Sequence, residues 1–182
     1  MPPPPPTPPA SSAGSPGRRG TARLLQAHGL RPDTDLGQHF LLDDNLVDLA
    51  VRQGRVGPDD VVLEIGPGVG TLTVALARAA RWVHAIEIDR RLAPVLVEVL
   101  AEISNVQLHW ADALRFDLEA LDPVPTRLVA NLPYSIATPI VLESLWRLPR
   151  VERWVVMVQR EVADRWAAPV GASAYGAPSV LL

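Results

Sequence analysis

A glycine-rich stretch directly after an apolar segment is the first feature of this chain that could serve chemistry. The segment 61–65 (VVLEI) runs into the loop 66–70 (GPGVG), which contains Gly66 and Gly68. Glycine lets the backbone turn sharply and approach a ligand, because no Cβ stands in the way. The spacing differs from that of the dinucleotide-binding fingerprint, and the Gly-Lys-Ser/Thr of a phosphate-binding P-loop is absent. The loop therefore predicts either a ligand contact or a plain turn between a strand and a helix.

Acidic side chains follow the next two apolar segments. Glu87 and Asp89 stand at the end of the segment 82–88, and Asp112 comes just after 106–110. A carboxylate beside a glycine loop can accept two hydrogen bonds from a ribose diol. A further acid at the neighbouring strand end can accept from an adenine amino group. Together with the loop, these acids indicate an adenosine-type cofactor.

The fourth apolar segment ends in Asn131-Leu132-Pro133-Tyr134. An amine on an adenine ring is a poor nucleophile because its lone pair is delocalised into the ring. The Asn131 side chain and the Leu132 carbonyl can accept both amine hydrogens, which favours the pyramidal nitrogen that attacks. Pro133 would fix the backbone, and Tyr134 offers a ring on which an extruded base can stack. These four residues are the predicted catalytic set for chemistry on the amine of a planar base.

The residues around these motifs predict the elements that position them. Apolar runs predict strands at 61–65, 82–88, 106–110, 127–132 and 154–159, and helical spacing predicts helices at 21–28, 43–54, 71–80, 91–102 and 136–148. Strands that alternate with helices indicate an α/β fold with a mostly parallel sheet covered on both faces. Ligands bind such sheets at the carboxyl ends of the strands, where the candidate residues fall.

Length and composition indicate one domain with a tail. The chain has 182 residues, of which 48% are hydrophobic. Residues 1–20 are rich in Pro, Ser and Gly and are expected to be a disordered tail, and residues 21–182 are expected to form the domain. No apolar run approaches the roughly 20 residues that span a bilayer, so no membrane partner is expected. With no signal peptide pattern and no cysteine, we expect a cytoplasmic protein.

The same composition excludes several kinds of site. The absence of cysteine excludes disulfides, thiolate zinc sites and a cysteine nucleophile. No cluster of His, Asp and Glu has metal-ligand spacing, so no metal is expected. His84 and His109 fall within predicted strands, where we expect them to pack rather than to bind a ligand.

The charge pattern is ambiguous about nucleic acid. The net charge is −3, which argues against a large electrostatic footprint on a nucleic acid. All 17 basic residues are Arg, whose planar guanidinium groups suit phosphate. A GC-rich genome, which favours Arg codons, would produce the same bias.

From about Leu36 to Ser179 the chain resembles the ribosomal small-subunit RNA adenine dimethyltransferase family. The resemblance is carried, in the family's order and spacing, by LGQHFLLD, VLEIGPGVGTLT, AIEIDRRLA, ADAL, VANLPYSIATPI, MVQREVADRWAAP and YGAPSV. It implies a Rossmann-like fold that uses S-adenosylmethionine. The implied activity is N6,N6-dimethylation of two adjacent adenines of 16S rRNA during maturation of the small ribosomal subunit. It would be carried out in the cytoplasm by a monomer.

The resemblance also implies roles for individual residues. The implied cofactor contacts are His39, Leu41, Gly66, Gly68, Glu87, Asp112 and Asn131. The implied contacts with the substrate RNA are Phe40, Tyr134, Arg160 and Arg165. The family usually has Asn where His39 stands, and the arginines are equally consistent with a solvated charged face.

The family continues for about another domain beyond the matched region. This chain ends at Leu182, where we expect the sixth strand to begin, so the predicted sheet is incomplete and the C-terminal helical domain is absent. One alternative is the macrolide-resistance methylase family, which dimethylates an adenine of 23S rRNA but more often has Ile in place of Leu132. Another is a non-catalytic module that binds the cofactor or rRNA. A small-molecule methyltransferase is the third.

Overall fold

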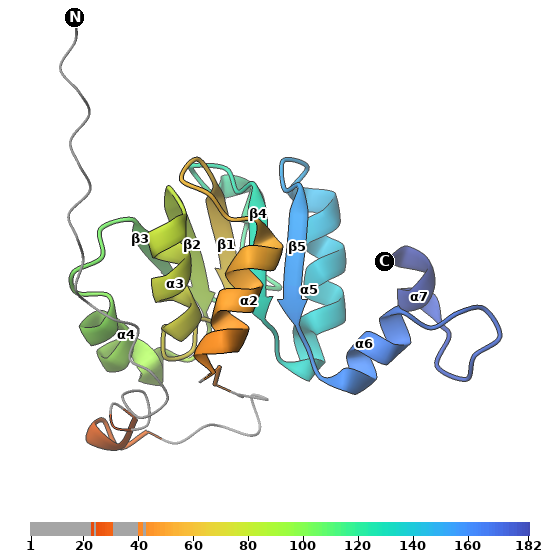
Figure 1. Cartoon of the computed structure of the whole chain (residues 1–182), viewed down its shortest axis with the longest axis horizontal. Helices are drawn as coiled ribbons and strands as arrows, with labels where there is room; N and C mark the ends of the chain where they lie inside the picture. The colour runs from red at the N-terminus through yellow and green to blue at the C-terminus, as the bar shows by residue number, and fades with distance from the viewer. Residues whose placement is uncertain (1–22, 24, 31–39, 42) are drawn as a thin grey trace, which may run out of the picture.

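Five parallel strands form the centre of the computed structural model, which describes Arg23 and residues 25–30, 40–41 and 43–182 (Figure 1). The strands are β1 (Val61–Ile65), β2 (Trp82–Glu87), β3 (Val106–Trp110), β4 (Arg127–Asn131) and β5 (Arg153–Met157). They lie side by side in the order β3-β2-β1-β4-β5. The chain therefore leaves β1 toward one edge and later returns to build the other. This places a topological switch point between β1 and β4, where ligands of such sheets bind.

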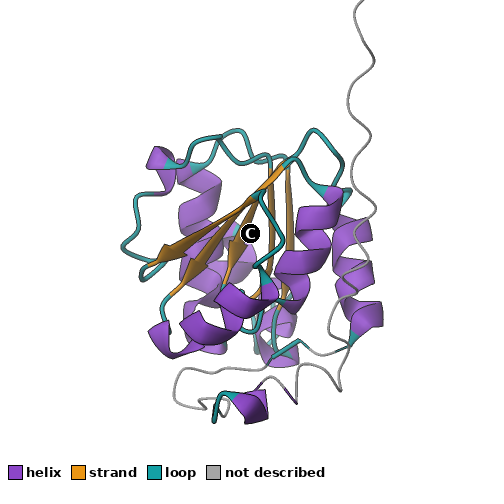
Figure 2. Ribbon diagram, turned by 90° about the vertical axis from the view of Figure 1, so that its left-hand side faces the viewer, coloured by secondary structure: helices purple, strands orange, loops and turns teal. Residues whose placement is uncertain are grey.

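Helices cover both faces of the sheet (Figure 2). On one face lie α2 (Asp44–Gly54), α3 (Thr71–Ala79) and α4 (Ala93–Val99). On the other lie α5 (Tyr134–Arg147) and the 3₁₀ turn η2 (Leu118–Ala120). The short helices α6 (Arg160–Trp166) and α7 (Ala177–Leu181) follow β5. Within the described residues, none of the helices has the length and apolar character needed to cross a membrane.

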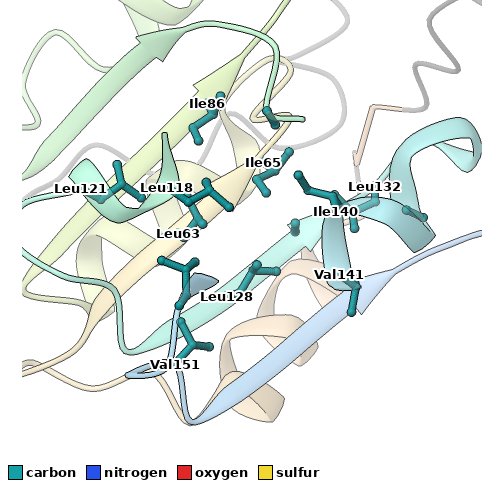
Figure 3. Close-up of a cluster of buried hydrophobic side chains, with 14 of the residues drawn as sticks. Leu63, Ile65, Ile86, Leu118, Leu121, Leu128, Leu132, Ile140, Val141 and Val151 are labelled. Atoms are coloured by element: carbon teal, nitrogen blue, oxygen red, sulfur yellow. The ribbon is translucent and has the colours of Figure 1, made fainter. Parts of the chain in front are cut away.

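The core holds β1 and β4 rigidly beneath the switch point. Every residue of β1 is buried. On the α5 face, Leu63 and Leu128 from the strands pack with Ile140 and Val141 of α5 (Figure 3). Burial on both sides is typical of a parallel sheet and explains why these strands consist of continuous apolar runs. The loops that follow β1 and β4 therefore start from fixed positions.

The predicted α/β fold is confirmed, with small differences at the ends of elements. All five predicted strands are present, and residues 25–27, within the predicted helix 21–28, are helical. The predicted helix 91–102 is instead the 3₁₀ turn η1 (Arg90–Leu92) followed by α4. Asp89 initiates this arrangement, because its carboxylate accepts a hydrogen bond from the Arg91 amide at 3.0 Å. The predicted tail at 1–20 lies outside the described residues.

The end of the chain differs from the prediction. Instead of the start of a sixth strand, residues 177–181 form α7. Pro178 stands in the first turn of this helix, and the Ser179 hydroxyl accepts a hydrogen bond from the Gly176 amide at 3.2 Å. The same hydroxyl donates to the Arg165 carbonyl at 2.6 Å, which attaches α7 to α6. Proline in the first turn and a side chain that caps the helix start both favour a helix.

His84 and His109 pack in the sheet, as predicted. His84 is fully buried, and its Nε2 lies 2.8 Å from the Pro123 carbonyl. A carbonyl only accepts, so Nε2 of His84 carries the proton, and Nδ1 accepts from His109 Nε2 at 3.1 Å. Burial lowers the pKa of both rings, and the pKa of His109 is lowered further by the charge of His84. The pair is therefore held in its neutral form.

This pair should make the protein sensitive to acid. The pKa of an unfolded His is about 6.5, so below that pH the unfolded chain binds more protons than the folded chain and the folded state loses stability. Buried Glu64 has a raised pKa, which makes the free energy of unfolding change with pH in the opposite direction. The effect of the His pair is therefore measured as a difference between two proteins that both contain Glu64. We expect the stability advantage of the wild type over His84→Gln to shrink as pH falls from 7.5 to 5. Urea unfolding of both proteins measures this, and a constant difference would contradict it.

Candidate functional site

A cavity of about 480 Å³ lies at the carboxyl ends of the strands. This volume is typical of small-molecule sites. The predicted site residues that line it are Phe40, Leu41, Gly66, Gly68, Glu87, Asp112, Asn131, Leu132 and Pro133. The structure thus brings most of the predicted cofactor and catalytic residues together at the switch point of the sheet.

The glycine loop lines the cavity directly after β1, the strand that lies between β2 and β4. Gly66 and Gly68 have φ angles of 71° and 58°, in the left-handed region that favours glycine. The Gly66 amide donates to the Ile86 carbonyl at 2.9 Å. A Cβ at Gly66 would lie 3.9 Å from the Asn131 carbonyl oxygen. The loop is therefore more than a connection, because it also lies next to the predicted catalytic residues.

Phe40 lies directly on the glycine loop. A Cβ at Gly68 would lie 3.0 Å from Phe40 Cδ1, tighter than most Cβ contacts, so the ring would have to shift by a few tenths of an ångström. Phe40 was predicted to hold the substrate base, and its contact with Gly68 places it on the wall that was predicted to bind the cofactor. Its role toward the base stays a prediction.

Replacement of Gly68 should therefore disturb both the backbone and Phe40. We expect Gly68→Ala to destabilise the fold by about 1–2 kcal/mol through its left-handed backbone alone, with an additional cost from the displaced Phe40 ring. Gly29→Ala is the matched control, since Gly29 has a φ of 65° and open space around its Cβ position. Denaturant unfolding compares the two variants. Equal destabilisation would show that the Phe40 contact carries no strain.

Glu87 connects the glycine loop to the next loop. The Glu87 carboxylate accepts hydrogen bonds from the Gly68 amide at 3.1 Å and from the Asp89 amide at 2.9 Å. It is buried, and desolvation by burial raises its pKa. A carboxylate offers about four acceptor positions, and the backbone amides around Glu87 do not use all of them, so acceptor capacity remains for a ligand hydroxyl. Glu87 therefore both braces the loop and presents acceptors.

The other two predicted strand-end acids differ from each other. Asp112 lines the cavity, its carboxylate accepts from the Leu114 amide at 3.0 Å, and its Oδ2 lies 3.6 Å from Nε of the exposed Arg115. Asp89 does not line the cavity and pairs with the Arg91 guanidinium at 2.8 Å. Of the two, Asp112 is therefore the acid available to a ligand.

Glu64 is a cavity residue to which the sequence assigned no role. Only 1% of it is exposed, and within the described part of the chain its Oε2 atom meets no hydrogen-bond criterion with any partner. Burial raises its pKa to about 8, with the neighbouring Glu87 charge adding to the rise and the Thr73 hydroxyl opposing it. A buried carboxyl with an unused oxygen is suited to receive a cation. An acid within the apolar segment VVLEI, next to the glycine loop, was the signal that could have revealed it.

The predicted catalytic tetrapeptide presents acceptors at the end of β4. Asn131 is half-buried, and the Leu132 amide donates to the Met157 carbonyl of β5 at 2.9 Å. None of the described backbone hydrogen bonds ends on the Leu132 carbonyl, whereas the Pro133 carbonyl accepts from Ile136 at 3.2 Å as α5 begins. The Asn131 side chain and the Leu132 carbonyl are therefore suited to accept the two hydrogens of one amine.

Some predicted residues lie elsewhere or outside the described part. Arg160 and Arg165 lie on α6, are exposed, and do not line the cavity. Arg160 lies 3.5 Å from Asp164. His39 and the side chain of Tyr134 lie outside the described residues. In the portion that the structure describes, no group of three or more His, Cys, Asp or Glu side chains is arranged to hold a metal ion.

Comparison with known proteins assigns the sequence to a family. The model of the family described as "Ribosomal RNA adenine dimethylase" matches residues 29–182. A protein of Thermobifida fusca named "Ribosomal RNA small subunit methyltransferase A" is 51% identical over 86% of this chain and 56% of its own length. A protein of the same name from Rubrobacter xylanophilus is 51% identical over 84% of this chain and 57% of its own length. The chain thus spans about half the length of these relatives.

Solved structures agree on the fold. A dimethyladenosine transferase from Plasmodium falciparum superposes with a TM-score of 0.69 at 30% identity, covering 78% of this chain and 51% of that one. The 23S rRNA methyltransferase ErmE superposes with a TM-score of 0.62 at 34% identity, covering 73% of this chain and 53% of that one. Both share the Rossmann-like arrangement described above.

Proposed function

This chain belongs to the ribosomal RNA adenine dimethylase family, and we propose that it methylates N6 of adenines in 16S rRNA with S-adenosylmethionine as methyl donor. One observation carries the proposal: acceptors for an amine and acceptors for an adenosine-type cofactor line the same cavity. The family acts on ribosomal RNA, so we place the reaction in the cytoplasm, where the small subunit is assembled.

The residues present fit the cofactor. Its ammonium group has a partner in the unused Oε2 of buried Glu64. Its ribose hydroxyls have acceptors on Glu87, and its adenine amine has one on Asp112. Gly66 and Gly68 leave the backbone open to close approach. The proposal thus gives a role to Glu64, the cavity acid whose buried Oε2 has no hydrogen-bond partner among the described residues.

Methyl transfer to an amine needs orientation more than acid–base chemistry. When bound, the cofactor would supply a methyl group on a sulfonium; transfer of that methyl group to the amine would leave a neutral thioether and release one amine proton to solvent. The Asn131 side chain and the Leu132 carbonyl hold the amine so that its lone pair is available. Positioning and fixed dipoles of this kind supply most of the acceleration in such a site.

The identity of the RNA is the finer part of the proposal. The two relatives at 51% identity are named small-subunit methyltransferases, whereas the 23S rRNA methyltransferase structure is 34% identical. These values, and Leu132 in the tetrapeptide, favour 16S rRNA. A 23S rRNA adenine methylase is the second candidate, because that structure shares the fold at more than 30% identity.

The test is incubation of the purified chain with radiolabelled S-adenosylmethionine and small subunits that lack the dimethyladenines, with 23S rRNA in parallel. Label in 16S adenine is the expected result. Label only in 23S rRNA would replace the proposal with its second candidate. No label in either RNA, with cofactor binding shown in the same preparation, would overturn the activity and leave a binding module.

Loss of the Glu87 carboxylate should weaken cofactor binding. We expect Glu87→Ala to weaken the binding free energy of S-adenosylmethionine by about 1–3 kcal/mol, the range for lost charge-assisted hydrogen bonds. Titration calorimetry measures it. Asp89→Asn is the matched control, since Asp89 is a strand-end acid that does not line the cavity. An unchanged constant in Glu87→Ala would mean that the ribose does not contact this carboxylate.

A further inference from the structure

We propose that the side-chain amide of Gln159 donates a hydrogen bond to ring nitrogen N1 of the target adenine and thereby positions the base for transfer. This inference rests on the proposed function, because it concerns the base that the same cavity would take. Gln159 would be a positioning residue in the turn between β5 and α6, across the cavity from the acceptors that hold the amine.

The position of Gln159 follows from the pairing of β4 with β5. Asn131, the last residue of β4, lies opposite Met157, the last residue of β5. The hydrogen bond from the Leu132 amide to the Met157 carbonyl, at 2.9 Å, continues this pairing beyond the strands. Gln159 comes two residues after Met157 and lines the cavity together with Asn131 and Ser135. The two strand ends therefore present Asn131 and Gln159 to the same part of the cavity.

Hydrogen bonds fix the backbone of Gln159, whereas its side chain does not cap the helix that follows. The Gln159 carbonyl accepts from Val162 at 3.0 Å and from Ala163 at 3.2 Å, which begins α6. Although Gln159 is the residue that caps this helix, its side chain makes no capping hydrogen bond. Gln159 is exposed as a residue and lines the cavity. A side chain whose backbone is fixed by the start of a helix is suited to position a ligand.

The chemistry of the base requires a donor at this place. The Asn131 oxygen and the Leu132 carbonyl accept the two hydrogens of the adenine amine. N1, the ring atom bonded to the same carbon as the amine, can only accept. Among the described side chains that line the cavity from β4, β5 and α5, those that can donate are the Asn131 and Gln159 amides and the Ser135 hydroxyl. Asn131 is already assigned to the amine, and the longer Gln159 side chain reaches further from the wall than Ser135.

Nuclear magnetic resonance can test the contact without any turnover. The cofactor pocket of the ¹⁵N-labelled chain is filled with S-adenosylhomocysteine, and the side-chain amide of Gln159 is assigned by its absence in Gln159→Ala. We expect its resonance to shift on titration with adenosine and with 7-deazaadenosine, but not with 1-deazaadenosine, which lacks N1. Equal shifts with all three nucleosides, or no shift with any, would overturn the proposal.

A transfer assay on RNA adds the energetic measure. We expect Gln159→Ala to slow methylation about tenfold, the effect of one lost hydrogen bond. Replacing the target with 1-deazaadenosine should slow the wild type by a similar factor and leave Gln159→Ala little changed. Glu161→Ala, an exposed neighbour on α6, is the control that should keep wild-type rates. If Ser135→Ala, and not Gln159→Ala, removed the sensitivity to N1, the proposal would be wrong.

The experiments distinguish failure of the proposed function from failure of the proposed role of Gln159. If the wild-type chain transfers no methyl group, the proposed function fails, and the resonance experiment still decides the role of Gln159. If the wild type methylates RNA and Gln159→Ala does so equally well, the function stands and the positioning role is wrong.

Discussion

Asn131→Ala should reduce methyl transfer by roughly 10²–10³-fold, the effect of removing one preorganised polar group from a reacting centre. The physical reason is that the amine keeps a single acceptor, the Leu132 carbonyl, and its lone pair returns to conjugation with the ring. The backbone pairing of Asn131 with Met157 does not depend on the side chain, so β4 should stay in place. Single-turnover rates at saturating cofactor and RNA measure the loss in the chemical step.

Two further measurements separate this effect from damage to the site. The cofactor should still bind to Asn131→Ala, at least weakly, because Glu64 and Glu87 lie on the other strands of the cavity. Asn131→Asp, which keeps an acceptor oxygen in nearly the same place, should retain more activity than the alanine variant. Unchanged turnover in Asn131→Ala would remove the proposed positioning of the nucleophile.

The sequence predicted the sheet and most of the cavity because both depend on local patterns. Short, mostly apolar segments such as 61–65 favour buried strands in a chain where they alternate with helices of this length. The polar residues that end these runs meet because parallel strands place their carboxyl ends at one edge. Glu87, Asp112 and Asn131 could therefore be expected in one site without any knowledge of distances.

What the sequence could not supply depends on contacts between distant residues. The pairing of His84 with His109 and the Pro123 carbonyl joins three parts of the chain, and no spacing encodes it. The contact of Phe40 with Gly68 likewise joins residues that are distant in sequence, so the sequence pattern does not encode it. The sequence analysis did not predict the final helix, α7, because its short apolar sequence has the composition of a strand. The hydrogen bond that the Ser179 hydroxyl accepts from the Gly176 amide stabilises the start of a helix instead.

Glu64 is a cavity acid that its apolar sequence neighbours made hard to recognise. It lies within a buried strand, where its neighbours in sequence are all apolar, so pattern alone groups it with the core. The structure separates it from them, since it lines the cavity and keeps an oxygen without a partner. Its raised pKa, about 8, means that near neutral pH the carboxyl is mostly protonated in the unliganded protein.

Binding of S-adenosylmethionine should therefore become tighter as the pH rises from 6 to 8. In the proposed site the ammonium group of the cofactor would pair with an ionised Glu64, and below pH 8 ionisation costs about 1.4 kcal/mol for each pH unit. The expected effect is up to about tenfold in the dissociation constant per unit. The sign follows from the raised pKa: protons that occupy Glu64 in the free protein must leave on binding, so acid opposes binding.

Glu64→Gln isolates this effect. Gln is a close match in shape to the protonated carboxyl, so the fold should tolerate it, but it cannot ionise. The variant should bind the cofactor weakly at pH 8 and lose most of the pH dependence that the wild type shows. Any contribution of Glu87, whose pKa burial also raises, is present in both proteins and leaves their difference unchanged.

Calorimetry in two buffers of different ionisation enthalpy counts the protons directly. At pH 7 the wild type should release close to one more proton on binding than Glu64→Gln does, because a group with a pKa near 8 is mostly protonated there. Equal proton release by the two proteins would mean that Glu64 does not meet the ammonium group. In that case the unused oxygen of this buried carboxyl would need another partner, and the polar ligand end would have to be sought beside Thr71, the other cavity residue whose buried hydroxyl has no partner in the described structure.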